Sequence, residues 1–385
     1  MADSVQKTGV SYPVVHIEED TSTSLALVPG ATAVPVFIGE FGAAFDGVVA
    51  RVDGWPDLSE AAEEGTIPWA VGEMLRGYFE NGGGYCYLAD NAGKTPQDAL
   101  ASVAAFDDVT ILVPLGLWHQ GVDAAGETAR AVTAYAANHR AMAILHANWD
   151  HDARQARDAA TAFNLDADQR AHAALYHPWV TPPRRQVEPV PPAEPLPPVE
   201  PVPPVGVVAE VWCRTDAERG VWKAAANVAV NGVEHPAREV ADQEQHEAQP
   251  VNFLREAPGR GTAILGALTL DDTDGPWRYI QTRRLADAVE RDLRKALRTA
   301  SSEPNGQSTW EALRSAAETY LYGIWKRGGL MGALEREAYF VQIGPGITMT
   351  DEDVTAGRII LKVGLAAVRP AEFIVLTLNS EATSA

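Results

Sequence analysis

The chain has 385 residues, 46% of them hydrophobic and 22% charged, a globular mixture that can bury a substantial core. Its length favours two or three domains, at roughly 150 residues per domain. The net charge of −21 argues against a protein that coats DNA or RNA, because phosphate binding needs a basic surface. It also argues against docking on an anionic membrane, and it favours solubility and basic partners.

No pattern in the chain is typical of secretion or membrane insertion. The two cysteines, Cys86 and Cys213, lack CxxC spacing, so neither a disulfide framework nor a cysteine zinc site is expected. The first residues lack the basic and then apolar order of a signal peptide. The uncharged segment 21–39 is interrupted by prolines and a glycine, so it does not predict a membrane span. We therefore expect a cytoplasmic protein.

Short apolar runs alternate with helical patterns in the first part of the chain. One helix is expected after Pro68, where apolar residues follow the spacing of a single helix face: Val71, Met74, Leu75, Tyr78 and Phe79. An alanine-rich helix is expected around 127–138. Runs of strand type occupy residues 34–38, 85–88, 109–113, 141–145 and 173–176. This alternation indicates an α/β fold.

A proline-rich segment divides the sequence in the middle. Eleven of the 23 residues in 182–204 are proline. Because proline lacks an amide donor and fixes φ, this segment is predicted to be extended and semi-rigid. We interpret it as a linker or a surface loop, with a ligand for proline-reading modules as the alternative.

Helices dominate the region after the proline-rich segment, and strands end the chain. One helix carries an apolar stripe at every fourth residue, with most of its basic residues elsewhere: Leu285, Val289, Leu293 and Leu297. Residues 308–311 predict a capping box, and the helix that it begins should stop at Gly328–Gly329. Strands are expected at 358–363 and 372–378. The last strand is apolar on both faces, so it needs a strand from a neighbouring copy or a central place in its own sheet.

The sequence offers little catalytic chemistry. His146, Asp150 and His151 form the best metal candidate, but their spacing matches no HExxH motif, and a polar turn between strand and helix is preferred. The glycine-rich stretches 81–84 and 258–261 match neither a P-loop nor a dinucleotide fingerprint, so turns with positive φ are expected. No GxSxG elbow is present. The sequence therefore predicts no enzyme, no cofactor and no metal.

An ordered series of short motifs runs through the second half of the chain. It comprises RTDAERGVWK at 214–223, AN at 226–227, PGRG at 258–261, GALTL at 266–270, WRYI at 277–280, RR at 283–284, EPN at 303–305, MTDED at 349–353, GR at 357–358 and RPAEF at 369–373. Their order and spacing resemble the tail-sheath subunits of contractile phage tails, R-type pyocins and phage-tail-like contractile injection systems. The first half agrees more loosely, at 9–19, 36–39, 78–87 and 176–179. Leu268 departs from the family motif, which has arginine there.

The resemblance implies a mixed α/β tail-sheath fold, in which amino-terminal residues complete the carboxy-terminal sheath domain and an α/β domain is inserted outward. The implied ranges are an amino-terminal arm at 1–25, an outer α/β domain at 26–181, a proline-rich linker at 182–204, a sheath domain at 205–365 and a carboxy-terminal strand or arm at 366–385. The resemblance also implies hexameric rings stacked helically around an inner tube, with baseplate and cap proteins as further partners. Contraction would slide and rotate the subunits.

Two sets of residues follow as candidates for contacts between subunits. The strand contacts implied by the family are Val10, Tyr12, Val14, His16, Phe373, Val375 and Thr377. Basic residues that face the tube or a neighbour are expected on two helices: Arg291, Arg294, Lys295, Lys326 and Arg327. Residues 278–298 hold seven basic and three acidic residues, and the alternative is a solvated helix face with pairs such as Glu290 with Arg294.

We therefore expect a structural subunit of a contractile sheath that drives a tube into a target without catalysis. The alternatives are a tube or baseplate component of the same particle and a metal-dependent hydrolase that uses His146, Asp150 and His151. We expect assembly in the cytoplasm, within a particle that the cell keeps or releases. Neither nucleic acid nor membrane binding by this chain is expected.

Overall fold

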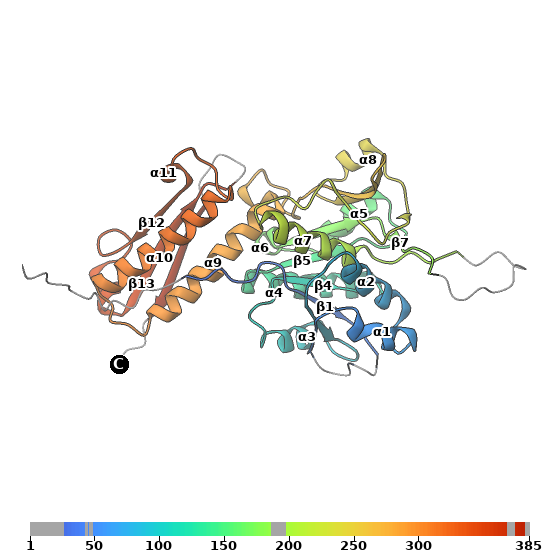
Figure 1. Cartoon of the computed structure of the whole chain (residues 1–385), viewed down its shortest axis with the longest axis horizontal. Coiled ribbons are helices and arrows are strands. Elements are labelled where there is room, and N and C mark those ends of the chain that lie inside the picture. The colour runs from blue at the N-terminus through green and yellow to red at the C-terminus, as the bar shows by residue number, and fades with distance from the viewer. Residues whose placement is uncertain (1–26, 43–44, 46–48, 186–197, 368–373, 382–385) are drawn as a thin grey trace, which may run out of the picture.

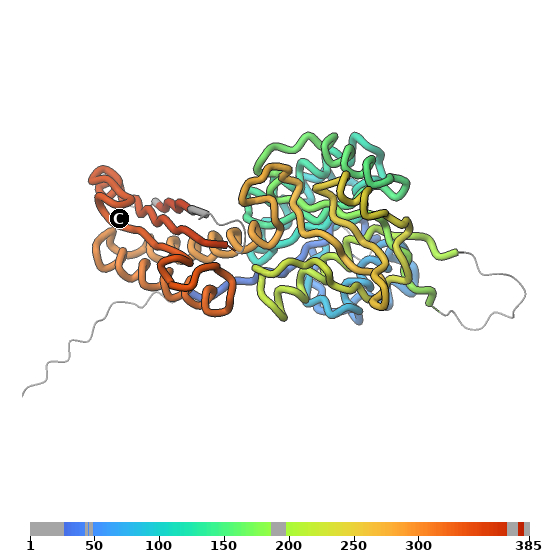
Figure 2. Tube along the Cα trace, turned by 90° about the horizontal axis from the view of Figure 1, so that it is seen from above, coloured from blue at the N-terminus to red at the C-terminus, as the bar shows by residue number. Residues whose placement is uncertain are grey.

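The molecule has two lobes, an α/β body and a narrower carboxy-terminal lobe, joined by one long helix (Figure 1). The structure is a computed structural model that describes residues 27–42, 45, 49–185, 198–367 and 374–381. Seen from above, the segment 27–34 leaves the side of the carboxy-terminal lobe and enters the body (Figure 2). Leu27 packs against the core of the carboxy-terminal lobe, so an amino-terminal residue contributes to that lobe.

A nine-stranded sheet forms the centre of the body, in the order β2-β3-β1-β4-β5-β6-β10-β11-β8. Its strands are β1 (Pro35–Gly39), β2 (Val49–Val52), β3 (Cys86–Asp90), β4 (Ile111–Pro114), β5 (Met142–His146), β6 (Ala173–His177), β8 (Val228–Ala229), β10 (Asn252–Ala257) and β11 (Gly261–Leu265). The strands from β3 to β10 in this order run parallel. Strands β1, β3, β4, β5 and β6 are buried at every position, as continuous apolar runs in a covered parallel sheet should be. All five strands predicted for the first half are confirmed.

Helices cover both faces of this sheet and create two apolar layers. The helices are α1 (Pro56–Glu63), α2 (Trp69–Glu80), α3 (Pro96–Val103), α4 (Val122–His139), α5 (Ala153–Ala162), α6 (Ala167–Ala171), α7 (Val205–Arg219) and α8 (Asp242–Glu247). Helices α3, α4 and α5 cover one face, and α1, α2 and α7 cover the other. The predicted helices after Pro68 and around 127–138 are α2 and α4.

The central sheet contains strands from both sides of the proline-rich segment. Strand β10 pairs with β6 through Asn252 with Tyr176 and Phe253 with His177, so residues from both sides of 182–204 share one sheet. The amide of Val180 donates to the carbonyl oxygen of Val202 at 2.9 Å, and the reverse bond is 2.8 Å long. The chain therefore leaves and re-enters the body at one point. A small sheet of β7 (Val180–Thr181) and β9 (His235–Pro236) lies beside this point.

The carboxy-terminal lobe packs two long helices against a three-stranded antiparallel sheet, β12-β13-β14. Its elements are the 3-10 helix η2 (Pro276–Arg278), α9 (Ile280–Ala300), α10 (Gln307–Lys326), α11 (Glu335–Ala338), β12 (Tyr339–Ile343), α12 (Asp351–Thr355), β13 (Arg358–Leu365) and β14 (Ile374–Glu381). The predicted apolar stripe of α9 is confirmed, because all four of its residues are buried in this core.

The predicted capping box of α10 is wrong. The helix begins at Gln307 with Gly306 as its N-cap, and no side chain caps it. Ser308 therefore lies inside the first turn, and Glu311 accepts a hydrogen bond from the Gln307 side chain at 2.8 Å. The predicted end is right: the helix stops at Lys326, and Gly328 has a φ of +78° that favours glycine.

The last strand is paired within the chain. Strand β14 runs antiparallel to β13, from the pair Leu365–Ile374 to the pair Arg358–Glu381. It lies at the edge of the sheet, not in its centre. Leu376 and Leu378 are buried whereas Thr377 is exposed, so one face is solvated and the expectation of two apolar faces is wrong.

Candidate interaction surfaces

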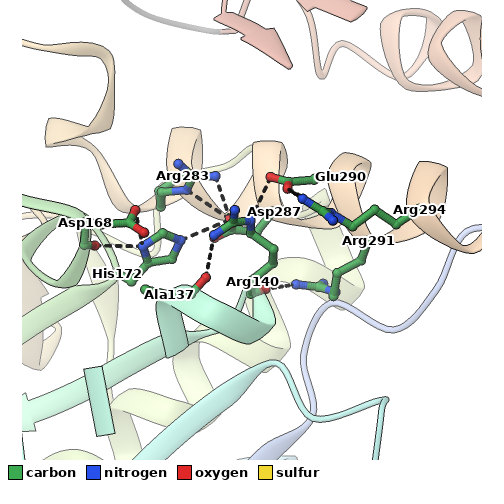
Figure 3. A network of polar contacts seen from close by, with 9 residues as sticks. All are labelled: Ala137, Arg140, Asp168, His172, Arg283, Asp287, Glu290, Arg291 and Arg294. Atoms are coloured by element: carbon green, nitrogen blue, oxygen red, sulfur yellow. Dashed lines mark hydrogen bonds and ion pairs between the residues drawn. The ribbon is translucent and has the colours of Figure 1, made fainter. Parts of the chain in front are cut away.

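A buried ionic network joins α9 to the body (Figure 3). Asp287 of α9 accepts hydrogen bonds from Arg283 at 3.0 Å from Nε and 2.6 Å from Nη2. His172, between α6 and β6, places Nε2 3.3 Å from the same carboxylate oxygen. Its Nδ1 lies 2.8 Å from the carbonyl oxygen of Asp168. His172 and Asp287 are both buried, so these bonds form away from water.

The network keeps both buried groups charged at neutral pH. Burial disfavours the imidazolium, but hydrogen bonds to Asp168 and Asp287 raise the pKa of His172 to about 9. Burial likewise opposes ionisation of Asp287, yet Arg283 and His172 lower the pKa of this carboxyl to about 2. A charge left alone here would be costly, because breaking a buried pair costs about 3–5 kcal/mol.

Next to this network, α9 makes a second set of polar contacts with the end of α4. Arg140 follows the last residue of α4 with a left-handed φ of 54°, and its Nε lies 2.8 Å from Glu290. Arg294 contacts the other oxygen of Glu290 at 2.7 Å. Arg291 donates to the carbonyl oxygens of Arg140 and, at 3.2 Å, of Ala31. Figure 3 shows these side chains side by side along α9.

A third contact fastens α9 to α7. Arg284 forms two hydrogen bonds with Asp216, 2.9 and 2.8 Å long, and a third with the carbonyl oxygen of Thr32 at 2.8 Å. Both side chains of the pair are almost fully buried. The sequence does not predict this pair, because nothing in the spacing of the two motifs that contain residues 216 and 284 brings them together.

The predicted basic residues therefore divide into two groups. Arg291 and Arg294 are engaged within the chain, and the predicted pair of Arg294 with Glu290 is confirmed. Lys295 is exposed beside them. Lys326 and Arg327 are exposed at the end of α10.

The end of α10 forms a patch of cations and aromatic rings, which we call the α10 patch: Trp222, Tyr322, Trp325, Lys326 and Arg327. Lys326 Nζ lies 5.2 Å from the ring centre of Tyr322 and 5.0 Å from that of Trp325. The guanidinium of Arg327 lies 5.2 Å from the ring centre of Trp222. Tyr322 is 40% exposed, large for an aromatic ring, and such a surface suits a partner with acidic groups.

The predicted strand contacts lie largely outside the described residues, which exclude Val10, Tyr12, Val14, His16 and Phe373. In β14, Val375 pairs with Gly364 and Thr377 with Lys362. These pairs use one edge of β14. The other edge pairs with no strand among the residues that the structure describes.

The other candidate motifs lie in or beside strands and turns. His146 is buried, and its Nδ1 lies 3.0 Å from the carbonyl oxygen of Ala147. Within the described residues no cluster of three or more His, Cys, Asp or Glu side chains could hold a metal ion. The expected positive-φ turns are confirmed at Gly82, Gly259 and Gly261, with φ of 101°, 73° and 72°. Among the helices in the described ranges, none has the length and apolar character needed to cross a membrane.

Comparison with known proteins points in one direction. The family model of the phage tail sheath C-terminal domain matches residues 272–381. One similar structure is the PVC sheath complex of an extracellular contractile injection system in the contracted state. It is 37% identical to this chain, with a TM-score of 0.76, and the match covers 96% of this chain and 98% of that chain. The contracted helical sheath of the anti-feeding prophage AFP is 35% identical, with a TM-score of 0.74 and coverage of 96% and 99%.

More distant structures share the fold alone. The sheath tail protein Lin1278 from Listeria innocua is 11% identical, with a TM-score of 0.65 and coverage of 93% of this chain and 97% of that chain. No curated protein matches the chain.

Proposed function

The chain belongs to the contractile tail-sheath protein family, and we propose from this membership that it polymerises around an inner tube and contracts to drive the tube into a target. One observation carries this function: over 96% of its length the chain is 37% identical to a sheath captured in its contracted state. Sheath identity accounts for the two-lobed fold, for the family match at 272–381 and for the predicted motifs. We place the subunits in hexameric rings stacked helically.

The α10 patch is the surface that we assign to the inner tube. Its two cations are exposed, and the ring of Tyr322 adds exposed apolar area beside Lys326. A contact that must break when the sheath contracts should be polar at its rim, because charge pairs set register without making the interface irreversible. The tube surface facing this patch should therefore be acidic.

The free edge of β14 is the surface that we assign to strand exchange between subunits. An uncovered edge presents unpaired backbone groups, and a strand from a neighbouring copy can satisfy them. Residues Val10 to His16 would supply that strand, and Val375 and Thr377 lie in the strand that receives it. Through this pairing, the carboxy-terminal residues 366–385 would take part in the connection between neighbouring copies.

We assign the chain no catalytic step, in keeping with its relatives, which are structural sheath proteins. The energy of contraction would be stored in the extended lattice, so contraction needs no nucleotide. Extended particles that contract only after ATP is added would contradict this. Assembly would take place in the cytoplasm, with baseplate and cap proteins at the ends, in a particle that then acts outside the cell. Neither nucleic acid nor a membrane is among its partners.

Negative-stain electron microscopy of the purified full-length chain tests the sheath function. We expect hollow helical tubes, and with the cognate tube protein we expect extended particles that shorten and widen when destabilised. A tube component would instead give narrow filaments of constant length, and a baseplate component would give discrete rings. A chain that stays monomeric at all concentrations, with or without the tube protein, would overturn the proposal.

A further inference from the structure

Helix α1 presents an acidic face that has no partner among the residues described by the structure. Residues 52–75 contain six acidic and no basic residues. Glu60, Glu63 and Glu64 are exposed, whereas Leu58 on the other side of the helix is buried in the core. In the part of the chain that the structure describes, these three carboxylates have neither an ion pair nor a hydrogen bond. We call them the α1 acidic face.

The arrangement of this face is unfavourable in an isolated subunit. Glu60 and Glu64 are four residues apart, where like charges on a helix repel each other. Glu63 is the last residue of α1 and Glu64 is its C-cap, and the last turn contains no basic residue. The helix dipole favours cations at this end and disfavours anions. A cation supplied from outside the chain would relieve both effects.

A groove between α9 and the end of α4 offers such cations. Its volume is about 480 Å³, and Arg291, Lys295 and Arg298 line it from α9. Lys295 and Arg298 are exposed. None of these three cations forms an ion pair with any described residue, whereas the neighbouring Arg294 is paired with Glu290. We call these three residues the α9 basic wall.

Arg291 distinguishes this wall from a helix face that is simply solvated. Its guanidinium donates only to backbone carbonyl oxygens, those of Arg140 and Ala31. Burial lowers the pKa of Arg291, although the nearby carboxylates of Asp287 and Asp292 oppose this effect. The opposite side of the groove holds Asp107 and Asp108, and Asp108 accepts hydrogen bonds from the hydroxyl groups of Tyr85 and Tyr87. An anionic partner is therefore attracted to α9 and not to that side.

We propose that the α1 acidic face of one copy docks on the α9 basic wall of a second copy. This inference deepens the proposed sheath function and rests on it. Helix α1 lies at the end of the body away from α9, so the two surfaces belong to different ends of the molecule (Figure 1). A contact between two different surfaces of identical chains repeats from copy to copy and builds rings or helices.

The net charge of the whole chain indicates that the partner docked on the α9 basic wall is a second copy. At a net charge of −21, copies repel one another over most of their surface. Attraction between them has to come from local complementary surfaces, and the exposed part of the wall provides one. The contact should therefore weaken as salt is added.

Charge reversal of each surface tests this contact. The first variant carries Lys295→Glu and Arg298→Glu, and the second carries Glu60→Lys and Glu64→Lys. The assay measures the critical concentration for polymer formation by sedimentation and negative-stain microscopy, at low and high ionic strength. A control variant, Arg219→Glu with Arg260→Glu, changes the net charge as much as the first variant at two exposed residues outside the groove.

We expect each variant alone to raise the critical concentration by about tenfold or more, because like charges then face each other. An equimolar mixture of the two variants should assemble as the wild type does. When the two variants alternate, every contact again joins opposite charges. The control variant should assemble normally. The contact is disproved if each variant polymerises like the wild type, or if the mixture is not rescued. A wild-type chain that never polymerises would overturn the sheath function itself, which is a separate outcome.

Discussion

At the scale of single residues, the polar side chains of α9 have two different roles that their sequence does not separate. Arg283, Arg284 and Arg291 face the body and bond to buried carboxylates or carbonyl oxygens. Lys295 and Arg298 face water. A substitution on this helix therefore affects either the stability of the subunit or its contacts with other copies, according to the face on which it lies.

Replacing His172 with Gln should destabilise the subunit in a pH-dependent way. The folded-state pKa of about 9 lies above the ordinary value of 6.5, so this stabilisation is complete below about pH 6.5 and is lost as the pH rises through about 9. We expect His172→Gln to lower the free energy of unfolding by about 3 kcal/mol at pH 6, and by much less at pH 10. Urea unfolding of both proteins at the two pH values measures the difference.

The exposed His235→Gln serves as the control substitution for this experiment. At the acid end, Asp287 contributes stability that is present above about pH 3.8 and lost as the pH falls through about 2. A destabilisation by His172→Gln that is equal at pH 6 and pH 10 would show that the imidazole acts through packing and not through its charge.

Two neighbouring charge reversals on α9 should differ sharply in their effect on folding. Arg291→Glu removes the hydrogen bonds to the carbonyl oxygens of Arg140 and Ala31, so we expect a loss of about 1–3 kcal/mol. Lys295→Glu changes an exposed side chain and should stay within about 0.5 kcal/mol of the wild type. Thermal unfolding of the two variants makes the comparison. Equal midpoints would contradict the inward role of Arg291.

This contrast also bears on the basic residues that the sequence predicts on α9. Reversing Arg291, Arg294 and Lys295 together would be the obvious test of a contact made by this helix. The structure places Arg291 against the body and pairs Arg294 with Glu290, so that triple variant would confuse loss of folding with loss of assembly. The pair Lys295 and Arg298 is the sharper probe of the helix surface.

At the scale of elements, the proline-rich segment is an insertion between neighbouring points of the body. The hydrogen bonds between Val180 and Val202 close it at the base, and Arg185 is held by Glu80 at 2.8 Å. Because the central sheet continues from β6 into β10, the two halves of the sequence do not depend on this segment for their relative position. The domain ranges drawn from the sequence stay a prediction.

Replacing residues 186–197 with a short Gly-Ser turn should leave folding intact. The hydrogen bonds between Val180 and Val202 and the ion pair of Arg185 both remain in this variant. A shorter flexible loop also costs less entropy to close. We expect the free energy of unfolding to change by less than about 1 kcal/mol. Denaturant unfolding tests this. A large loss of stability would show that the segment supports the body. The same conclusion would follow if the variant stayed soluble but hydrogen exchange showed that β6 and β10 no longer pair.

At the scale of the whole molecule, assembly depends on surfaces that folding does not use. The α1 acidic face, the α10 patch and the two exposed residues of the α9 basic wall, Lys295 and Arg298, carry charges outside the three apolar cores. The free edge of β14 is a fourth such surface. A subunit can therefore fold as a monomer and still carry the information for a lattice.

Deleting residues 1–21 should prevent assembly without affecting folding. This segment lies before Leu27, the first described residue that packs on the carboxy-terminal lobe. We expect the truncated chain to stay soluble with an unchanged unfolding midpoint, and to form no long sheaths, because the strand that covers β14 of a neighbour is missing. Sedimentation and electron microscopy of the truncated and full-length chains give the comparison. Normal sheaths from the truncated chain would contradict this role of the arm.

The sequence by itself determined the local elements and the family. Continuous apolar runs at 109–113 and 141–145 predicted buried strands, and the stripe from Leu285 to Leu297 predicted the buried face of α9, because periodicity reports directly which side of an element meets a core. The ordered motifs predicted a sheath subunit. Each of these signals is contained in a short stretch of chain.

Only the tertiary structure decided which distant residues meet. The pairing of β10 with β6, the meeting of Val180 with Val202 and the bonds from Arg284 to Asp216 join residues that are between 22 and 76 positions apart in the chain. No periodic pattern encodes such contacts, since they depend on how the layers pack. The same packing turned Arg291 inward and left Lys295 in water, because a helix rotates neighbouring residues to different faces and the neighbour on each face is set by the fold.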